Sequence, residues 1–198
     1  MKTLVPVLVA LCALAVAAPA SRAQAGSMAQ QKAPTVASVL NGMYGNVEQE
    51  VVSAAEAMPE DKYSFAPTNG EFKGVRTFAE QVKHIAAANH LFFGPLVGET
   101  IDTKHIEENG PASIKTKAEI VQYLKDSFAL GHRAIATFTS ENLVTPLDKP
   151  VFSFLATRLA IATLGCGHPF DHYGQMVEYL RMNGIIPPAS RPRPQQTQ

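Results

Sequence analysis

Hydrophobic residues recur at intervals of three and four along most of the chain, which is the pattern of amphipathic helices. The first such segment runs from residue 35 to about residue 58, where Pro59 ends it. Its apolar positions are Val36, Val39, Leu40, Met43, Val47 and Val51, followed by Ala54 or Ala55. The next segment, residues 59–76, lacks a helical period and is rich in turn formers. We therefore expect a long ordered loop there, with Tyr63 and Phe65 as anchors onto the helices.

Two further helices begin at capping-box sequences, in which an N-cap hydroxyl and a glutamate three residues later satisfy free backbone amides. Thr77 and Glu80 open one helix, and Thr116 and Glu119 open another after a polar connection, residues 97–115. The buried face of the later helix is marked by Ile120, Leu124, Phe128, Ile135 and Phe138.

The last helix is expected to begin near Val151, after a break at residues 145–150. Asn183 and Gly184 form its stop signal. No segment shows convincing β alternation. Four amphipathic helices joined by long connections predict an all-α fold, a four-helix bundle over residues 35–190.

The start of the chain has the form of a secretory signal peptide. Lys2 is followed by an apolar run over residues 4–18, which is too short to span a bilayer comfortably, and Ala23-Gln24-Ala25 is a small-x-small cleavage site. We therefore expect residues 1–25 to be removed and the protein to be exported to the periplasm or secreted. The alternative is a retained membrane anchor. Residues 26–34 are expected to form a flexible leader.

Charge and hydropathy of the remaining chain narrow the range of partners. The full sequence has 17 Lys and Arg residues and 17 Asp and Glu residues, and loss of Lys2 and Arg22 leaves 15 minus 17, a formal charge of −2. Because no basic stripe is present, nucleic acid is not an expected partner. No later segment is long and apolar enough to span a membrane, and residues 191–198 are expected to form a disordered tail.

The number of cysteines and the residues around them exclude or disfavour several kinds of covalent modification. A lipid anchor at Cys12 is disfavoured because the bulky Leu11 precedes it. After cleavage only Cys166 remains, so the mature chain can form no internal disulfide. There is no C-x-x-C-H sequence, which excludes a covalently attached c-type haem.

The stretch G-C-G-H-P-F-D-H-Y-G-Q, residues 165–175, carries the clearest candidate chemistry. His168 and His172 are four residues apart and would lie on one face of a helix. Pro169 fits there either because the residue four positions earlier is Gly165, or because a new helical segment begins at the proline. The pair can place two ring nitrogens on one ion, although two solvated histidines would show the same spacing.

A metal ion would need a third ligand, and His84 is the best candidate. It lies one turn inside the second helix, in the stretch Q-V-K-H-I-A-A-A-N-H. If the second and fourth helices are neighbours, His84, His168 and His172 form a three-histidine site. Such a site leaves coordination positions for water or a substrate. Three imidazoles favour Zn²⁺ or Ni²⁺.

Two parts of the sequence resemble DinB-like (DinB/YfiT-type) proteins. Residues 54–72 and 76–89, which include E-A-M-P-E-D-K-Y-S-F and R-T-F-A-E-Q-V-K-H-I, resemble the N-terminal half of that family. Residues 168–190, H-P-F-D-H-Y-G-Q-M-V-E-Y-L-R-M-N-G-I-I-P-P-A-S, resemble its C-terminal signature. The two parts occur in the expected order and at a plausible distance.

This resemblance implies a four-helix bundle with a divalent-metal site. The three metal-binding histidines would correspond to His84, His168 and His172. Some members of the family are thiol S-transferases or isomerases that use low-molecular-weight thiols with a bound metal, and many have no known reaction. The family name refers to DNA-damage induction, a stress response, and does not imply a DNA polymerase. Dimerisation through a face of the bundle is compatible with the resemblance.

Some residues near the histidines are weaker candidates. Glu80 lies one turn before His84 and could orient it or act as a base, but its capping role already explains it. Gln175 could hydrogen bond to a ligand histidine or lie on the surface. Asp171 points about 100° away from His172 on an ideal helix, so a direct ligand role is not expected.

Two more candidates could complete or line a site. Cys166 could supply a thiolate ligand, although a small packed residue is the simpler interpretation. His132 falls near the apolar stripe of the third helix and could line the site, but a buried, hydrogen-bonded histidine is the default. We assign no function to His90, which faces another side of its helix, or to His105, which lies in a loop.

Two functional hypotheses follow. The first is an exported metal-dependent enzyme, a hydrolase or a thiol or group transferase acting on an unidentified small molecule. In it, the ion lowers the pKa of a bound water or activates a thiol. The second is a non-catalytic bundle that binds a small ligand or a protein, with a structural or stored metal. A closed structural site would require a fourth protein ligand such as His132 or Cys166.

Overall fold

The computed structural model describes residues 33–102, 105 and 107–192. This part of the chain contains four long helices and no strand, which confirms the prediction of an all-α bundle. The helices are α1 (Val36–Ala57), α2 (Phe78–Phe93), α3 (Lys117–Ile135) and α4 (Arg158–Met182). Short 3-10 turns lie between and after them: η1 (Glu60–Lys62), η2 (Gly94–Val97), η3 (Ser153–Leu155) and η4 (Pro188–Ser190).

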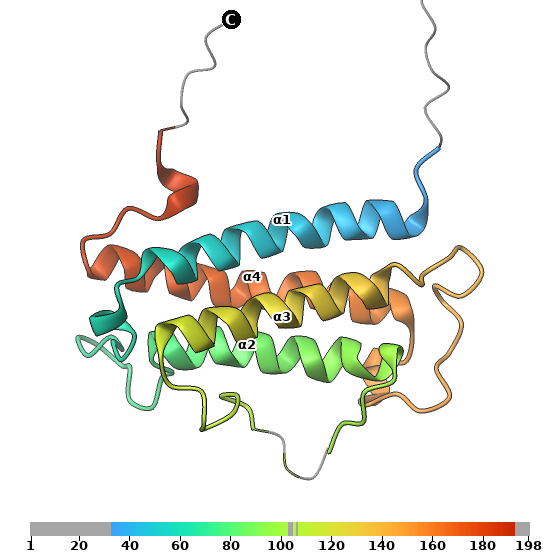
Figure 1. The fold of residues 1–198 in the computed structure, drawn as a ribbon, viewed down its shortest axis with the longest axis horizontal. Helices are drawn as coiled ribbons and strands as arrows, with labels where there is room; N and C mark the ends of the chain where they lie inside the picture. Colours follow the sequence, from blue (N-terminus) through green and yellow to red (C-terminus); the bar gives the residue numbers. More distant parts are fainter. Residues whose placement is uncertain (1–32, 103–104, 106, 193–198) are drawn as a thin grey trace, which may run out of the picture. The chain divides into compact units, whose positions relative to one another are not determined.

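The order of the helices in the bundle brings α2 and α4 side by side. Each of α2 and α1 packs against both α3 and α4. Figure 1 shows that α1 and α4 run in one direction, while α2 and α3 run in the opposite direction. The connection from α2 to α3 is therefore a long crossover, and the end of α2 lies near the start of α4.

The predicted signal peptide, residues 1–25, lies outside the described residues, as do nearly all of the predicted leader and most of the predicted tail. Among the helices that are described, none has both the length and the hydropathy required to cross a bilayer.

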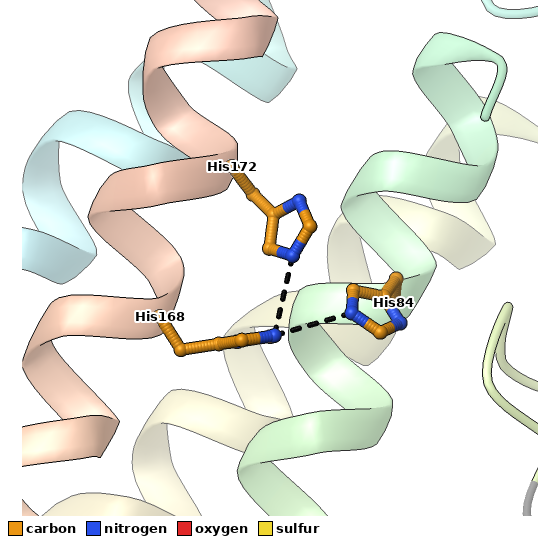
Figure 2. A group of neighbouring side chains, drawn as sticks. All are labelled: His84, His168 and His172. Carbon is orange, nitrogen blue, oxygen red and sulfur yellow. Dashed lines mark hydrogen bonds between the residues drawn. The ribbon is translucent and has the colours of Figure 1, made fainter. Parts of the chain in front are cut away.

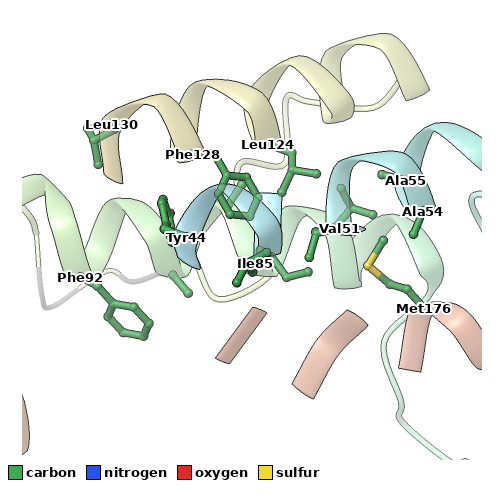
Figure 3. Packing of buried hydrophobic residues seen from close by; sticks show 14 of the residues in the cluster. Tyr44, Val51, Ala54, Ala55, Ile85, Phe92, Leu124, Phe128, Leu130 and Met176 are labelled. Atoms are coloured by element: carbon green, nitrogen blue, oxygen red, sulfur yellow. The ribbon is translucent and has the colours of Figure 1, made fainter. Parts of the chain in front are cut away.

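An aromatic cluster fills the middle of the bundle (Figure 3). Tyr44 of α1 lies with its ring centroid 5.2 Å from that of Phe93 and 5.1 Å from that of Phe128. All three side chains are fully buried. Met176 and Leu180 contribute the α4 side of the same core. The apolar stripes of four helices thus meet in one continuous core, which fixes the relative rotation of α2 and α4.

Both predicted capping boxes are present. The backbone N–H of Thr77 donates to the Glu80 carboxylate over 2.8 Å, and Thr116 and Glu119 make the equivalent pair at the start of α3. A third capping box, between Thr35 and the Ser38 hydroxyl, opens α1. It was not predicted because a serine takes the place of the usual glutamate or glutamine.

The loop between α1 and α2 is held by the two predicted anchors. The Tyr63 hydroxyl donates to the carbonyl oxygen of Ala55 over 2.7 Å, and its ring lies against Phe78. Phe65 packs edge-on against Tyr179 of α4, with 5.6 Å between the ring centroids. These contacts tie the entry of α2 to α1 and α4.

The start of α4 differs from the sequence prediction. The helix begins at Arg158, capped by the Thr157 hydroxyl, and not near Val151. The preceding apolar residues form a loop in which the backbone N–H of Leu147 donates to the carbonyl of Ala156 over 2.8 Å. The prediction was wrong because the apolar positions of this segment serve loop packing: Leu155 is buried without being part of the helix.

The helix continues without a break through Pro169, so no new segment begins there. Pro169 has no N–H, so it leaves the carbonyl oxygen of Gly165 without its usual helical donor. The proline ring also crowds this carbonyl group. Gly165 itself lies against Phe93, so closely that an added Cβ would overlap the ring. The glycine thus permits the close approach of α2.

Two glycines of α4 provide a test of this packing. Gly165→Ala is expected to lower the free energy of unfolding by about 1–3 kcal/mol, because Phe93 is fully buried and cannot move away cheaply. Gly167→Ala is the matched control: apart from its chain neighbours and the backbone of its own helix, no described atom lies within 4 Å of its added Cβ, so it should raise stability by up to about 1 kcal/mol. Chemical denaturation measures both. Equal effects of the two substitutions would contradict the packing argument.

Candidate metal centre

Three imidazole rings converge between α2 and α4 (Figure 2). His84 comes from the middle of α2, and His168 and His172 come from successive turns of α4. The Nε2 atom of His168 lies 3.1 Å from Nε2 of His84 and 3.2 Å from Nε2 of His172. The structure therefore brings together the three histidines that were predicted to share a site.

The outer nitrogens of two rings are held by oxygen acceptors. Nδ1 of His84 lies 2.5 Å from the backbone carbonyl oxygen of Glu108, and Nδ1 of His172 lies 2.7 Å from the side-chain oxygen of Gln81. A carbonyl oxygen can only accept, so each Nδ1 carries the proton and donates it. The Nε2 lone pairs of these two rings then point toward His168.

A chain of side chains fixes the orientation of the Gln81 amide. Its nitrogen donates to the oxygen of Gln175 over 2.7 Å, and the nitrogen of Gln175 faces the Asp171 carboxylate at 3.4 Å. Because a carboxylate accepts only, each amide in turn must present its oxygen toward the site. Asp171 thus acts on His172 through two glutamines, although it does not reach the histidines itself.

Burial keeps the three rings neutral. Loss of solvation, together with the neighbouring charges of His84 and Arg76, lowers the pKa of His168 to about 4, against a smaller raising effect of Asp171. Burial and the other two histidines lower the pKa of His172 to about 3. Burial also lowers the pKa of His84, which the Glu108 carbonyl partly offsets. Near neutral pH the lone pairs are therefore free to bind a cation.

The geometry fits a metal ion with imidazole ligands. Two nitrogens that bind one tetrahedral ion at about 2.0–2.1 Å lie about 3.3–3.4 Å from each other. The two Nε2 separations of 3.1 and 3.2 Å are close to this value. Ligand histidines usually donate their second N–H to a carbonyl or carboxylate, as His84 and His172 do here.

A polar pocket of about 320 Å³ adjoins the residues that hold the histidines. Gln81 and Glu108 line it, together with Arg76, Asn109 and Gln175 at its polar wall. Arg76 donates to Asn109 over 2.7 Å and pairs with the Glu108 carboxylate at 3.3 Å. The arginine therefore holds the turn whose carbonyl contacts His84.

The match to known families agrees with this architecture. A model of the DinB superfamily matches residues 43–176, which is more than half of the chain and includes all three histidines. The chain belongs to the DinB superfamily. A comparison with functionally curated proteins finds no match. The family assignment confirms the resemblance seen in the sequence.

Three other predicted candidates of this DinB-superfamily protein, Glu80, His132 and Cys166, lie outside the histidine cluster that the described residues form. Glu80 caps α2. His132 lies 2.7 Å from Asn41 and 3.0 Å from Glu48 of α1, so it is hydrogen-bonded as expected, but its side chain is partly exposed and not buried. Cys166 is half-buried, and burial raises the pKa of its thiol. Among the described residues, neither His132 nor Cys166 belongs to the three-histidine cluster.

The remaining histidines lie elsewhere, as expected. His90 stacks on Tyr123 and contacts the Glu99 carboxylate at 3.1 Å. His105 lies in the crossover and contacts Asp102 at 2.8 Å. Both are outside the cluster formed by the described residues.

Sequence reasoning missed three residues that hold the site: Gln81, Glu108 and Arg76. Gln81 had a signal in the sequence, because this polar residue lies on the same helical stripe as Phe78 and Ile85. The structure shows that it is buried. Glu108 had none, since it acts through its backbone carbonyl. Arg76 also acts mainly by holding that turn.

Removing the acceptor for His172 tests the support of the centre. Gln81→Leu is expected to weaken binding of Zn²⁺ at the three histidines by about 10- to 100-fold, because the tautomer and ring orientation of His172 are no longer fixed. Competition with a chromogenic chelator measures the affinity. Gln122→Leu is the control, because Gln122 is exposed on α3 and, among the described residues, bonds only to Asp126. A folded Gln81→Leu protein with unchanged affinity would rule out this role.

Proposed function

We propose that this DinB-superfamily protein binds a divalent metal ion through Nε2 of His84, His168 and His172. The convergence of the three nitrogens within 4.8 Å carries the proposal. The hydrogen bonds at Nδ1 of His84 and His172 support it, because they direct the lone pairs inward. Three neutral, partly buried imidazoles favour Zn²⁺ or Ni²⁺, both of which accept imidazole ligands readily.

We further propose that the site is catalytic. Three protein ligands are typical of catalytic zinc sites, whereas structural sites usually have four. The two residues considered for closing the site do not do so: His132 bonds to α1, and Cys166 lies outside the cluster. These positions favour an enzyme over a bundle with a structural or stored metal.

A bound ion would supply Lewis acidity and lower the pKa of a bound water or thiol, which suits hydrolysis or group transfer. The chain's own residues orient the reactants. Gln81 and the Glu108 carbonyl hold two ligand rings in fixed tautomers. Arg76 and Gln175 line the adjoining polar pocket and can donate hydrogen bonds to a polar small-molecule substrate.

The metal content of three purified proteins tests the first proposal. Without a His-tag or chelator, the parent is expected to carry or take up close to one Zn²⁺ or Ni²⁺ per chain, measured by mass spectrometry of the metal. His84→Ala should lose it, because two imidazoles rarely hold an ion. His90→Ala is the matched control on the same helix, since His90 contacts Glu99 and Tyr123 and not the cluster.

Two results would contradict the proposal. One is a His84→Ala protein with the metal content of the parent. The other is a parent that is metal-free as purified and fails to take up either ion. If the ion is present, a screen of hydrolase and thiol-transfer substrates would distinguish the two reaction classes. The screen uses the metal-loaded parent and Arg76→Ala.

A further inference from the structure

A second cavity lies near the end of the bundle where α2 ends and α4 begins. It measures about 350 Å³, within the range of small-molecule sites in proteins. The walls are mainly apolar and come from both helices and the loop between α3 and α4: Leu91, Phe92, Leu96, Leu147, Leu155 and Ile161. None of the groups that hold the three histidines lines it.

One charged side chain reaches into these apolar surroundings. Arg158 lines the cavity, and its Nε is buried and has no hydrogen-bond partner among the residues that the structure describes. Within the described residues its one hydrogen bond is long, 3.4 Å from Nη1 to the carbonyl oxygen of Asn142. Within the described part of the chain, Arg158 forms no ion pair. A buried guanidinium donor without an acceptor is costly, so the site favours an acceptor from a ligand.

The surrounding charges do not supply that acceptor. Asp148 and Lys149 also line the cavity, but both are exposed and of opposite sign. Arg158 is the first residue of α4, whose first turn contains no acidic residue. The positive end of the helix dipole therefore adds to the guanidinium charge.

We propose that this cavity binds a small amphipathic carboxylate, with its apolar body against Phe92, Leu155 and Ile161 and its carboxylate on Arg158. A planar carboxylate matches the fork of a guanidinium and can accept two N–H bonds. Asp148 and Lys149 of the wall are exposed, whereas Arg158 presents a buried Nε beside the apolar side chains. One such guanidinium suits a monoanion with a hydrocarbon part, and not a polyanion. The proposal does not depend on the metal centre.

The loop that covers the cavity is already held in place. The backbone N–H of Leu147 donates to Ala156 over 2.8 Å, and that of Leu159 donates to Leu143 over 2.9 Å. Phe152 and Phe154 stack on each other within the same loop. Little ordering is therefore needed on binding, which favours measurable affinity for a small ligand.

Phe92 separates the cavity from the histidines. Its ring lies apart from those of Tyr44 and Phe128 in Figure 3, and it contacts His168 edge-on with 5.6 Å between the ring centroids. A ligand against Phe92 would therefore lie one ring away from the metal centre. Binding should shift the NMR resonances of the His168 ring even though the ligand does not touch it.

Titration of the purified protein with octanoate and with its neutral counterpart octanamide tests the proposal. Calorimetry should show that octanoate binds, and that octanamide binds at least about tenfold more weakly because it cannot form the charge-assisted pair. In Arg158→Met, octanoate affinity should fall to that of the amide. Arg181→Gln is the control: it removes an exposed arginine of α4 that pairs with Glu178, and it should leave binding unchanged.

Three outcomes would overturn the proposal: no binding of octanoate, equal binding of acid and amide, or unchanged affinity in a folded Arg158→Met protein. The acid–amide comparison uses the unaltered protein, so the test remains decisive if the variant does not fold. Repeating the titration with His84→Ala separates this site from the metal centre. Binding that disappears in that variant would assign the carboxylate to the metal centre instead.

Discussion

The unbroken path of α4 across Pro169 places His168 and His172 one turn apart on the face that meets α2. A break at the proline would rotate the two rings away from each other. Gly165, one turn earlier, leaves room for the buried Phe93 of α2, which an added Cβ would overlap. This glycine therefore contributes to the close approach of α2 and α4 that brings His84 to the other two histidines.

The polar groups around the histidines form a connected set within a largely apolar bundle. Hydrogen bonds lead from Asp171 to Gln175 within α4, from Gln175 to Gln81 of α2, and from Gln81 to His172. Arg76 holds the turn that presents the Glu108 carbonyl to His84. Such networks specify a structure when every member has a partner. The arrangement holds the rings of His84 and His172 at Nδ1 and leaves their Nε2 atoms directed toward His168.

Much of the architecture could be predicted, because helix periodicity and capping are local properties. The hydroxyl and carboxylate of Thr77 and Glu80 signal the start of α2 without any knowledge of its neighbours. The start of α4 could not be placed in this way. Leu155 is apolar and buried through loop packing, so in the sequence it has the same pattern as a buried residue of the helix. Local pattern alone does not distinguish these two uses of an apolar residue.

The histidine cluster was predictable only in part. The spacing of His168 and His172 indicates a shared face, but pairing with His84 depends on which helices are neighbours, a property of the whole bundle. The contribution of the Glu108 backbone carbonyl has no signature in residue type. Gln81 was predictable in part. A polar residue on an apolar stripe suggests a buried hydrogen bond, but the sequence does not show that the partner is His172.

The separation of the three rings along the chain has a consequence for folding. His84 and His168 are 84 positions apart, and the intervening sequence includes the whole crossover and α3. The ring nitrogens can therefore meet only after a large loop has closed, and this closure costs chain entropy. An ion held by both helices would act as a cross-link between an early and a late part of the chain. It would stabilise the completed bundle in preference to any partly folded form, by about 2.7 kcal/mol when the free ion is at 100 times its dissociation constant.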